Sequence, residues 1–325
     1  MIITKTPLRL SIGGGGTDLP FFYPVHGGEL ITAAINKYVY VTVAERKFHN
    51  NFRVSYSKTE ETENKDKIEN TRVREALKFL DINDPLEIST ISEVPGSSGL
   101  GSSSAFLVGL LNALHLYKRE HVSSKVLAEE AAEIEINLLK EPIGKQDQYA
   151  SALGGINNLK INKKGLVTSE PINVSLNVLR DLERNLHIFF TGITRNSTEI
   201  LKDQAKKATE EDRIKYMLQI KEIGADIKRA LERGDLKKFG RLLDLHWEIK
   251  KKTSDKMTDQ KIDRWYDLAL KNGAFGGKIM GAGGGGFLLF YCDNNNNFVK
   301  NMEDAGLKHV PFHFDFDGSK VLLNI

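Results

Sequence analysis

Apolar and polar residues follow two different spacings in the first half of the chain. Segments with the two-residue alternation or the short apolar runs of β-strands lie between segments with the three- to four-residue spacing of helices. The predicted strands are residues 2–12, 29–35, 38–45, 52–57 and 86–91, and the predicted helices are residues 73–79, 102–116 and 123–139. Residues 58–67 are polar and charged, which favours an exposed loop. Strands and helices therefore alternate along this half.

The second half is mostly helical in spacing. Residues 197–272 have the helical pattern, with breaks expected at Gly234 and in 253–258. Short strands are predicted at residues 187–191, 277–280 and 287–292. The change of pattern near residues 175–186 predicts a boundary between a domain of residues 1–180 and a domain of residues 181–325.

A turn dipeptide lies close to the C-terminus. Asp317 and Gly318 separate two apolar segments, residues 310–316 and 320–325. Because Asp-Gly is the residue pair that a tight hairpin turn prefers, we expect these segments to form a closing β-hairpin.

Composition narrows the class of protein. The chain has 325 residues, of which 40% are apolar and 27% charged, as in globular proteins of about two domains. With 46 Lys and Arg against 43 Asp and Glu, the net charge of +3 disfavours a nucleic-acid-binding protein. The single cysteine, Cys292, cannot form an internal disulfide, and no apolar run approaches the ~20 residues of a membrane span. Without a signal-peptide pattern, we expect a cytoplasmic protein that binds neither nucleic acid nor membranes.

The glycines are concentrated in a way that turns alone do not explain. Three short runs hold 12 of the 28 glycines: residues 13–16, residues 96, 99 and 101, and residues 281 and 283–286. Glycine costs backbone entropy, so clusters of it usually mark unusual backbone angles or close approach of a ligand. We therefore expect the three runs to lie at a binding site.

The second run has the properties of a phosphate-binding loop. The segment PGSSGLGSSSA, residues 95–105, lies between a predicted strand and a predicted helix. Its amides and the positive end of the helix can hold an anion, while its serines can cap the helix or ligate a cation. Gly101 is followed by Ser102 and not by lysine, which excludes a Walker A loop. The third run contains G-x-G-x-x-G but precedes a strand, so it is not a dinucleotide-binding fingerprint.

Carboxylates follow the second glycine run. On helix 123–139, Glu135 lies at the edge of the apolar stripe and Glu133 points toward solvent, so Glu135 is better placed to reach a half-buried site. Asp147 follows a loop rich in proline and glycine. It is either an N-cap residue or a general base that orients a hydroxyl nucleophile.

Together the three runs resemble the three motifs of the GHMP kinase superfamily, which includes galactokinase, homoserine kinase and mevalonate kinase. Motif one corresponds to residues 7–18, motif two to PGSSGLGSSSA, and motif three to KIMGAGGGGF at residues 278–287. The resemblance implies a two-domain α/β (α+β) GHMP kinase fold. The N-terminal domain would be like domain 2 of ribosomal protein S5, and the C-terminal domain would be ferredoxin-like with extra helices. It also implies an active site between the domains, the cofactors ATP and Mg²⁺, and phosphoryl transfer to the hydroxyl of a small molecule.

The resemblance also implies roles for individual residues. Asp147 matches the catalytic aspartate and Arg9 the basic residue beside it, while Ser103 and Glu135 match the magnesium ligands, with Glu133 as the alternative to Glu135. The residues expected to bind ATP are Pro95, Gly96, Ser97, Ser98, Gly99, Leu100, Gly101, Ser102, Ser103 and Ser104. The residues expected to bind the substrate are Gly15, Gly16, Thr17, Asp18, Gly283 and Gly284.

Motif one bears on the substrate. Galactokinases have Gly-Glu-His-Thr-Asp where this chain has Gly-Gly-Gly-Thr-Asp, so the aspartate that would bind sugar hydroxyls, Asp18, is kept. The string TPLRLSIGGGGTDLPFFY is similar to that of the D-glycero-D-manno-heptose 7-phosphate kinases, which phosphorylate the anomeric hydroxyl. Fucokinases and galactokinases are the main alternatives, and a decarboxylase of the same superfamily or a nucleic-acid-binding module is a remote one. A substrate that already carries phosphate needs another cation, for which Arg195 is the candidate.

Other features are expected to be structural. The run Lys250-Lys251-Lys252 should be a solvated helix end that suits the helix dipole. His246 and Trp247 are expected to pack in the core. The sugar, its anomer and the oligomeric state stay open, with a homodimer as one possible assembly.

Overall fold

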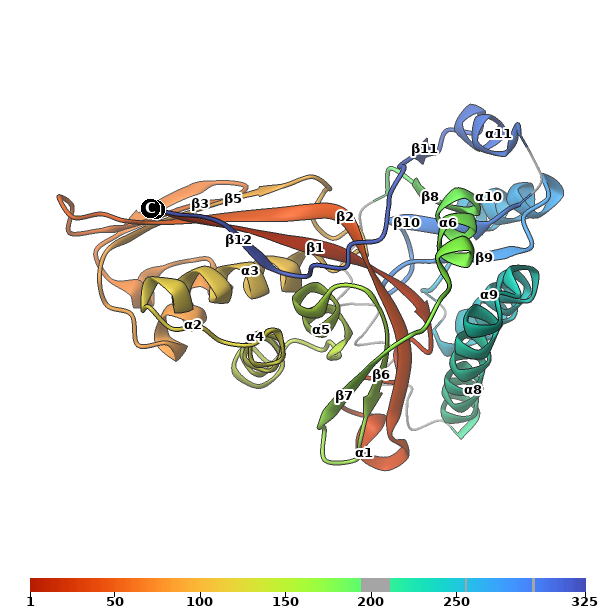
Figure 1. The fold of residues 1–325 in the computed structure, drawn as a ribbon, viewed down its shortest axis with the longest axis horizontal. Helices are drawn as coiled ribbons and strands as arrows, with labels where there is room; N and C mark the ends of the chain where they lie inside the picture. The colour runs from red at the N-terminus through yellow and green to blue at the C-terminus, as the bar shows by residue number, and fades with distance from the viewer. Residues whose placement is uncertain (194–210, 255, 294–295) are drawn as a thin grey trace.

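The computed structural model describes residues 1–193, 211–254, 256–293 and 296–325. A large sheet with helices on one face forms one end of the molecule, and a smaller sheet with its own helices forms the other (Figure 1).

The large sheet has eight strands and is built around β2 (Gly28–Glu45). One edge of β2 pairs with β1 (Ile2–Gly13). On the other edge, the first part of β2 pairs with β6 (Ile156–Ile161) and the last part with β5 (Leu86–Ser92). The remaining strands are β3 (Phe52–Ser55), β4 (Thr59–Thr62), β7 (Val167–Pro171) and β12 (Lys320–Asn324).

The helix α3 (Ser102–Tyr117) lies directly on β1 and β2 because of a glycine at its centre. A Cβ at Gly109 would lie 2.7 Å from Thr6 Oγ1 of β1, and Thr4 Oγ1 donates a hydrogen bond to Gly109 O at 2.9 Å. The loop before the helix is fixed to the same strand, since Arg9 N donates to Leu100 O at 3.0 Å. These contacts place the N-terminus of α3 beside the middle of β1.

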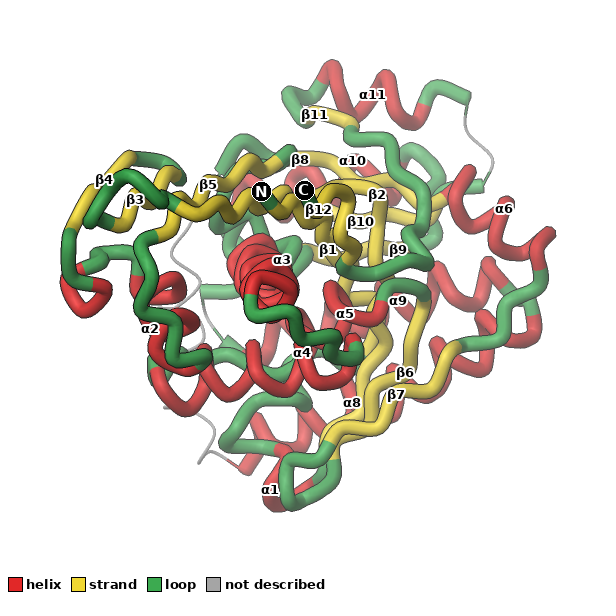
Figure 2. The backbone as a smooth tube through the Cα atoms, turned by 60° about the vertical axis from the view of Figure 1, so that its left-hand side comes forward, coloured by secondary structure: helices red, strands yellow, loops and turns green. Residues whose placement is uncertain are grey.

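The other helices of this half cover the same face of the sheet (Figure 2). They are α2 (Thr71–Phe79), α4 (Ser124–Ala132) and α5 (Gln146–Leu153). The short α1 (Tyr23–His26) lies in the connection from β1 to β2, and η1 (Lys65–Lys67) precedes α2. A π-helical segment, η2 (Glu133–Leu138), continues α4.

The second half contains a four-stranded antiparallel sheet with helices packed around it. Its strand order is β11 (Lys308–His309), β8 (Leu186–Phe190), β10 (Phe287–Tyr291) and β9 (Gly276–Ile279). Its helices are α6 (Leu176–Asn185), α8 (Glu211–Arg233), α9 (Leu236–Lys250), η3 (Lys251–Thr253), α10 (Gln260–Lys271) and α11 (Phe298–Asp304). Trp247, Phe189 and Phe290 belong to a core of their own between sheet and helices.

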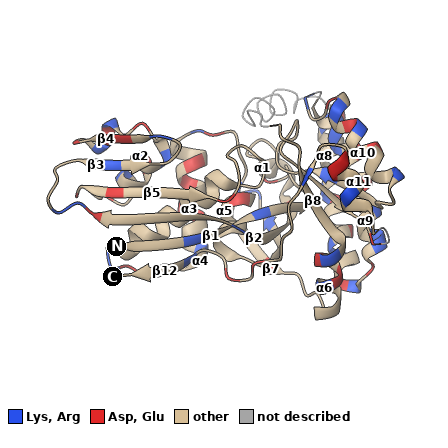
Figure 3. Cartoon of the chain, turned by 90° about the horizontal axis from the view of Figure 1, so that it is seen from above, with Lys and Arg blue, Asp and Glu red and all other residues tan. Residues whose placement is uncertain are grey.

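Charged residues on α8–α11 have both signs, so the described part of this face has no uniformly basic surface (Figure 3). Among the described helices, none is both long and apolar enough to cross a bilayer.

Most predicted elements are confirmed, including the break at Gly234 between α8 and α9. Three differ. Residues 58–67 contain the strand β4 and the 3₁₀ turn η1, because β4 pairs with β3. The helix predicted at 123–139 changes to π-helical geometry at Glu133.

The predicted C-terminal hairpin is wrong. Residues 320–324 form β12, which pairs with β1 of the first sheet, with Ile2 opposite Asn324 and Lys5 opposite Lys320. The preceding segment forms only an isolated bridge, from Phe314 to Ile35. The last strand therefore pairs with the free edge of β1, whereas the turn dipeptide alone predicted pairing with the segment just before it. The division at residues 180 and 181 remains a prediction, and the last strand belongs to the first sheet.

Candidate active site

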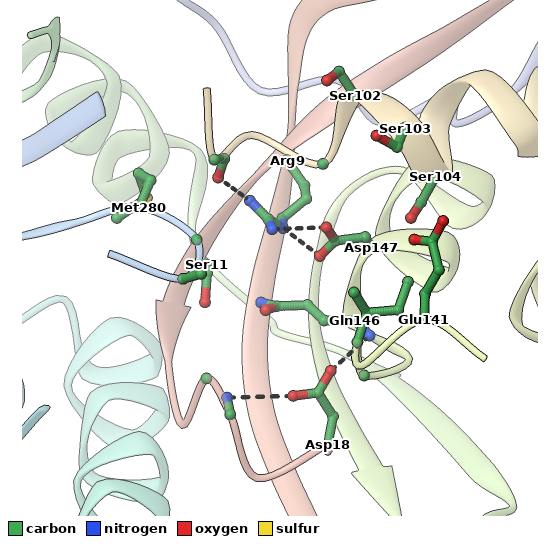
Figure 4. Close-up of a pocket in the computed structure, with 18 of the residues that line it drawn as sticks. Arg9, Ser11, Asp18, Ser102, Ser103, Ser104, Glu141, Gln146, Asp147 and Met280 are labelled. Atoms are coloured by element: carbon green, nitrogen blue, oxygen red, sulfur yellow. Dashed lines mark hydrogen bonds and ion pairs between the residues drawn. The ribbon is translucent and has the colours of Figure 1, made fainter. Parts of the chain in front are cut away.

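A cavity of about 340 Å³ lies between the two halves of the molecule, and all three glycine runs reach it. Its walls come from β1 and the loop after it, the N-terminus of α3, the start of α5, the end of α9, and the loop between β9 and β10 (Figure 4).

The loop before α3 presents backbone amides without a side-chain cap. Gly101, the N-cap residue, has a left-handed backbone (φ 78°), and no side chain of the described residues caps the first turn. The serines therefore do not cap the helix as the sequence allowed. Ser102, Ser103 and Ser104 all line the cavity. Uncapped amides and the helix dipole make this turn a site for an anion such as a phosphate.

The second and third glycine runs touch each other. A Cβ at Gly99 would lie 2.7 Å from Met280 O, and a Cβ at Gly281 would lie 2.8 Å from Gly99 Cα. A Cβ at Gly286 would lie 2.1 Å from Ser98 O. The two loops approach backbone to backbone, which only glycine permits, and so close one side of the cavity.

Arg9 and Asp147 form a paired ion bridge at the centre of the cavity (Figure 4). Arg9 Nε donates to Asp147 Oδ1 at 2.7 Å and Arg9 Nη2 donates to Oδ2 at 2.8 Å. Arg9 Nη1 also donates to Gly99 O at 2.6 Å, which ties the pair to the glycine loop. A Cβ at Gly101 would lie 3.1 Å from Asp147 Oδ2, so glycine also makes room for this carboxylate. The bidentate contact fixes the carboxylate in one orientation.

Glu135 is fully buried beside the first turn of α3. Its Oε2 accepts hydrogen bonds from Ser104 Oγ at 2.7 Å and Gln148 Nε2 at 2.6 Å, and its Oε1 accepts one from Arg72 Nε at 2.8 Å. The π-helical turn η2 carries Glu135 inward, while Glu133 stays exposed. The serine that Glu135 contacts is Ser104, one position after the serine predicted from the sequence.

The oxygen atoms of Glu135 and of the neighbouring serines suit a hard cation such as Mg²⁺. Mg²⁺ binds oxygen ligands, usually one or two carboxylates together with substrate phosphates. One buried carboxylate, Glu135, lies next to the hydroxyls of Ser103 and Ser104 at the edge of the cavity. No group of three acidic, His or Cys residues that could bind a metal occurs among the described residues. A bound metal would therefore take some of its oxygen ligands from the protein and others from a phosphate.

Asp18 is held at the opposite end of the cavity. Its Oδ1 accepts from Gly16 N at 3.2 Å and its Oδ2 from Gln146 N at 2.9 Å. Burial raises the pKa of Asp18, the Gln146 hydrogen bond lowers it, and the nearby charge of Asp147 raises it further. A Cβ at Gly144 would lie 2.0 Å from Asp18 Oδ2, so only glycine fits beside this carboxylate.

A second, more open pocket adjoins the first. It shares Arg72, Ser102 and Ser103 with the cavity and is lined by Val39, Phe106 and other residues of the first half. The anion site at α3 therefore lies between a polar cavity and a more apolar pocket.

Comparison with known proteins identifies the family. The family models "GHMP kinases N terminal domain" and "GHMP kinases C terminal" match residues 70–155 and 227–305. A D-glycero-alpha-D-manno-heptose 7-phosphate kinase of Campylobacter jejuni is 32% identical over 87% of this chain and 86% of the relative. The chain belongs to the GHMP kinase family. This kinase therefore uses ATP and transfers phosphate to an alcohol group.

Two other relatives place this GHMP kinase among enzymes of sugar metabolism. The crystal structure of a D-glycero-D-manno-heptose 1-phosphate kinase from Bacteroides thetaiotaomicron has a TM-score of 0.82 at 26% identity, with full coverage of both chains. A galactokinase of Pyrococcus furiosus is 26% identical over 59% of this chain and 60% of its own length. The two-domain GHMP kinase fold expected from the sequence is thereby confirmed.

Most of the predicted site residues of this GHMP kinase meet at the cavity. Those that line it are Arg9, Gly15, Gly16, Asp18, Ser97, Gly99, Gly101, Ser102, Ser103, Ser104, Glu135, Asp147 and Gly283. Their individual roles remain predictions.

Several other predicted residues do not line the cavity and instead stabilise the loops around it. Thr17 is fully buried, and its Oγ1 donates to Gly14 O at 2.8 Å. Leu100 is buried in the hydrophobic core. Gly284 N donates to Met257 O at 2.8 Å.

The remaining predicted residues lie elsewhere. Ser98 is buried and Pro95 is exposed, and neither lines the cavity. Gly96 lines the adjoining pocket. Arg195 lies outside the described residues.

The lining residues that were not predicted include Arg72, Gly144, Gln146 and Lys250. Lys250 is only 5% exposed, so the expectation of a solvated helix end is wrong for this residue. The sequence contains a signal for it, since Lys250 continues the buried stripe of α9 formed by Phe239, Leu243 and Trp247 at helical spacing.

Proposed function

We propose that this kinase transfers the γ-phosphate of ATP to the anomeric hydroxyl of D-glycero-D-manno-heptose 7-phosphate and makes the 1,7-bisphosphate. Such a product would feed the synthesis of nucleotide-activated heptose for surface polysaccharide. The similarity to the Campylobacter jejuni heptose 7-phosphate kinase carries the proposal, because it extends over 87% of the chain at 32% identity. The identity is lower to the Pyrococcus galactokinase, 26% over 59% of the chain, and to a galactokinase of Thermotoga neapolitana, 24% over 86% of the chain.

The arrangement of the site supports transfer of a phosphate from ATP, bound at one end of the cavity, to a sugar bound at the other. We place the ATP phosphates at the uncapped amides of α3 and the base in the adjoining pocket. The sugar then lies at the other end of the cavity, where Asp18 can accept hydrogen bonds from its hydroxyl groups. The side-chain amide nitrogen of Gln146 is buried at the cavity wall and has no hydrogen-bond partner among the residues that the structure describes, so it offers a further donor to the sugar.

Asp147 would orient the attacking hydroxyl and accept its proton. As the O–H bond breaks, the sugar oxygen attacks the γ-phosphorus in line, the bond from that phosphorus to the bridging oxygen breaks, and ADP leaves. The guanidinium of Arg9 keeps Asp147 in position and offsets charge on the transferring phosphoryl group.

Magnesium has a place in this scheme. Mg²⁺ bound by Glu135 and a serine hydroxyl at the start of α3 would neutralise charge on the phosphates. Arg72 donates a hydrogen bond to Glu135 in this structure, so Glu135 would lose a hydrogen bond if it ligated the metal.

A competition among acceptors tests the proposal. ADP formation is measured with heptose 7-phosphate, galactose and fucose under identical conditions. We expect kcat/KM to be highest with heptose 7-phosphate. A higher value with galactose or fucose would instead assign a galactokinase- or fucokinase-like sugar 1-kinase.

A further inference from the structure

A buried lysine from the second half of the molecule reaches the cavity. Lys250 is the last residue of α9, and its Nζ donates to Gly281 O at 2.7 Å, which places it against the third glycine run. The charges that shift its pKa are those of Arg9 and Asp18, after burial as the main cause. Lys250 therefore lines the cavity within reach of the charges of both Arg9 and Asp18.

Lys250 lacks the carboxylate partner that the other cations of the cavity have. Among the described residues, three cations line it: Arg9, Arg72 and Lys250. Arg9 is paired with Asp147, and Arg72 with Glu135 and with a second glutamate. Within the described ranges, the ammonium of Lys250 has one hydrogen-bond partner, the carbonyl of Gly281. A buried ammonium without an opposite charge is unfavourable, so this one is suited to an anion that arrives with the ligand.

Two further basic side chains lie behind Lys250 and are equally unpaired. Lys278 of β9 and His246 of α9 are fully buried, and in the described part of the chain neither Lys278 Nζ nor either ring nitrogen of His246 has a hydrogen-bond partner. Burial, together with the charge of Lys250, lowers the pKa of both groups. Asp18 is the acid whose charge favours the ammonium of Lys250, but its oxygens accept hydrogen bonds from the amides of Gly16 and Gln146, and it forms no ion pair with Lys250 among the described residues. Each basic group disfavours the charge of the next, which an anion bound in front of them would offset.

We propose that Lys250 binds the phosphate that the sugar substrate already carries, so that it selects a sugar phosphate over the neutral sugar. This inference rests on the proposed function and deepens it, because it assigns the extra cation that a heptose 7-phosphate needs. The ATP phosphates have their own donors at the uncapped amides of α3. Lys250 is thus a binding residue for the acceptor, while Lys278 and His246 position it from behind.

Kinetics of Lys250→Met with two acceptors tests the assignment. The acceptors are D-glycero-D-manno-heptose 7-phosphate and the same heptose without its phosphate. Loss of a charge-assisted hydrogen bond should raise KM for the phosphorylated heptose about 10- to 100-fold. KM for ATP and for the neutral heptose should change by less than about twofold, because neither uses the ammonium.

Lys251→Met is the matched control. This neighbouring lysine pairs with Glu248 and does not line the cavity, so the substitution removes the same charge from the same helix end without touching the site. Its kinetic constants should equal those of the wild type.

Several outcomes would overturn the inference. An unchanged KM for the phosphorylated heptose, an equal rise for both heptoses, or a rise in KM for ATP would each show that Lys250 does not bind the acceptor phosphate. A wild-type enzyme inactive on both heptoses would refute the proposed function itself. If Lys250→Met does not fold, inhibition of the wild type by inorganic phosphate decides. We expect competition with the heptose phosphate and not with ATP, and competition with ATP alone would refute the assignment.

Discussion

Asp147 is the residue on which the chemistry of the site depends most. Both of its oxygens accept hydrogen bonds from Arg9, so it is positioned before any substrate arrives. We expect Asp147→Asn to lower kcat by about 10²- to 10⁴-fold, the usual contribution of a general base. Affinity for a non-hydrolysable ATP analogue, measured by calorimetry, should be retained, since the phosphate amides of α3 are untouched. Full turnover in this variant would remove Asp147 as the base.

Gly144 sets the position of Asp18. Because a Cβ there would lie 2.0 Å from Asp18 Oδ2 and its φ is not positive, Gly144→Ala acts by steric displacement of the carboxylate. We expect KM for the sugar acceptor to rise about tenfold, as for loss of one hydrogen bond to a charged group. KM for ATP is the internal control and should not change. A variant with normal acceptor KM would show that Asp18 does not contact the sugar.

The pH dependence of acceptor binding follows from Lys250. Burial and the charge of Arg9 lower the pKa of Lys250 to about 8, although Asp18 acts in the opposite direction. The other basic groups that face it, Lys278 and His246, also have lowered pKa values. Because an anion binds the protonated ammonium, KM for the sugar phosphate should rise as the pH passes above 8, by up to about tenfold per unit. Lys250→Met should show a flat profile over this range, and an equally steep profile in the variant would contradict the assignment.

Residues in local motifs could be predicted, while those that depend on tertiary contacts could not. Arg9, Glu135 and Asp147 stand near glycine runs or at the edge of a helical stripe, and the cavity contains all three. Ser104 contacts Glu135, which lies in a π-helical turn, and a single sequence does not reveal which serine of the run faces that turn. Lys250 was missed because a lysine run at a helix end normally lies in solvent.

At the scale of elements, the junction of α3 with α4 carries a pH-dependent contact. His115 Nδ1 lies 2.8 Å from Glu120 Oε2, and Nε2 lies 2.7 Å from Glu130 Oε2. The hydrogen bond with Glu130 is the largest of several influences that together raise the pKa of His115.

The raised pKa makes part of the folding free energy depend on pH. Protonated His115 should stabilise the protein fully below pH ~6.5, the unfolded pKa of histidine. This contribution is about 1 kcal/mol, since solvent screens the contact with Glu120. It is lost as the pH rises through the pKa of His115 in the folded protein. His115→Gln should lower the free energy of unfolding in urea at pH 6 and change it less at pH 8.5. Equal losses at both pH values would exclude titration of His115 as the cause.

Elements were predictable where the local pattern and the packing agree. The alternation of Val39, Val41 and Val43 correctly predicted part of β2, since all three side chains are buried. The hairpin predicted from the Asp317-Gly318 dipeptide was wrong because such a dipeptide specifies a turn but not which strand pairs after it. The partner of β12 is decided by the open edge of β1, more than 300 residues away in the chain.

At the scale of the whole molecule, β12 connects the end of the second half to the sheet of the first. Ser319 Oγ lies within 2.9 Å of Thr6 Oγ1, and the strand then pairs with β1. Deletion of residues 319–325 should lower the free energy of unfolding by at least about 2 kcal/mol, from several lost hydrogen bonds. Chemical denaturation measures this loss.

The double variant Val321→Thr and Leu322→Thr is the control for the deletion. Both side chains are partly exposed, and the backbone ladder of β12 stays intact in the variant. We expect its stability to be close to that of the wild type. A loss as large as that of the deletion would show that the side chains, and not the strand pairing, stabilise this edge.

The pairing of β12 with β1 also bears on how the protein is made. During translation, β1 meets its outer neighbour β12 only after more than 300 further residues have been added to the chain. At about 5–20 residues per second, this delay is roughly 15–60 s. During that time the edge of β1 is open to other strands, so the nascent chain is the form of this enzyme most exposed to aggregation and to chaperone binding.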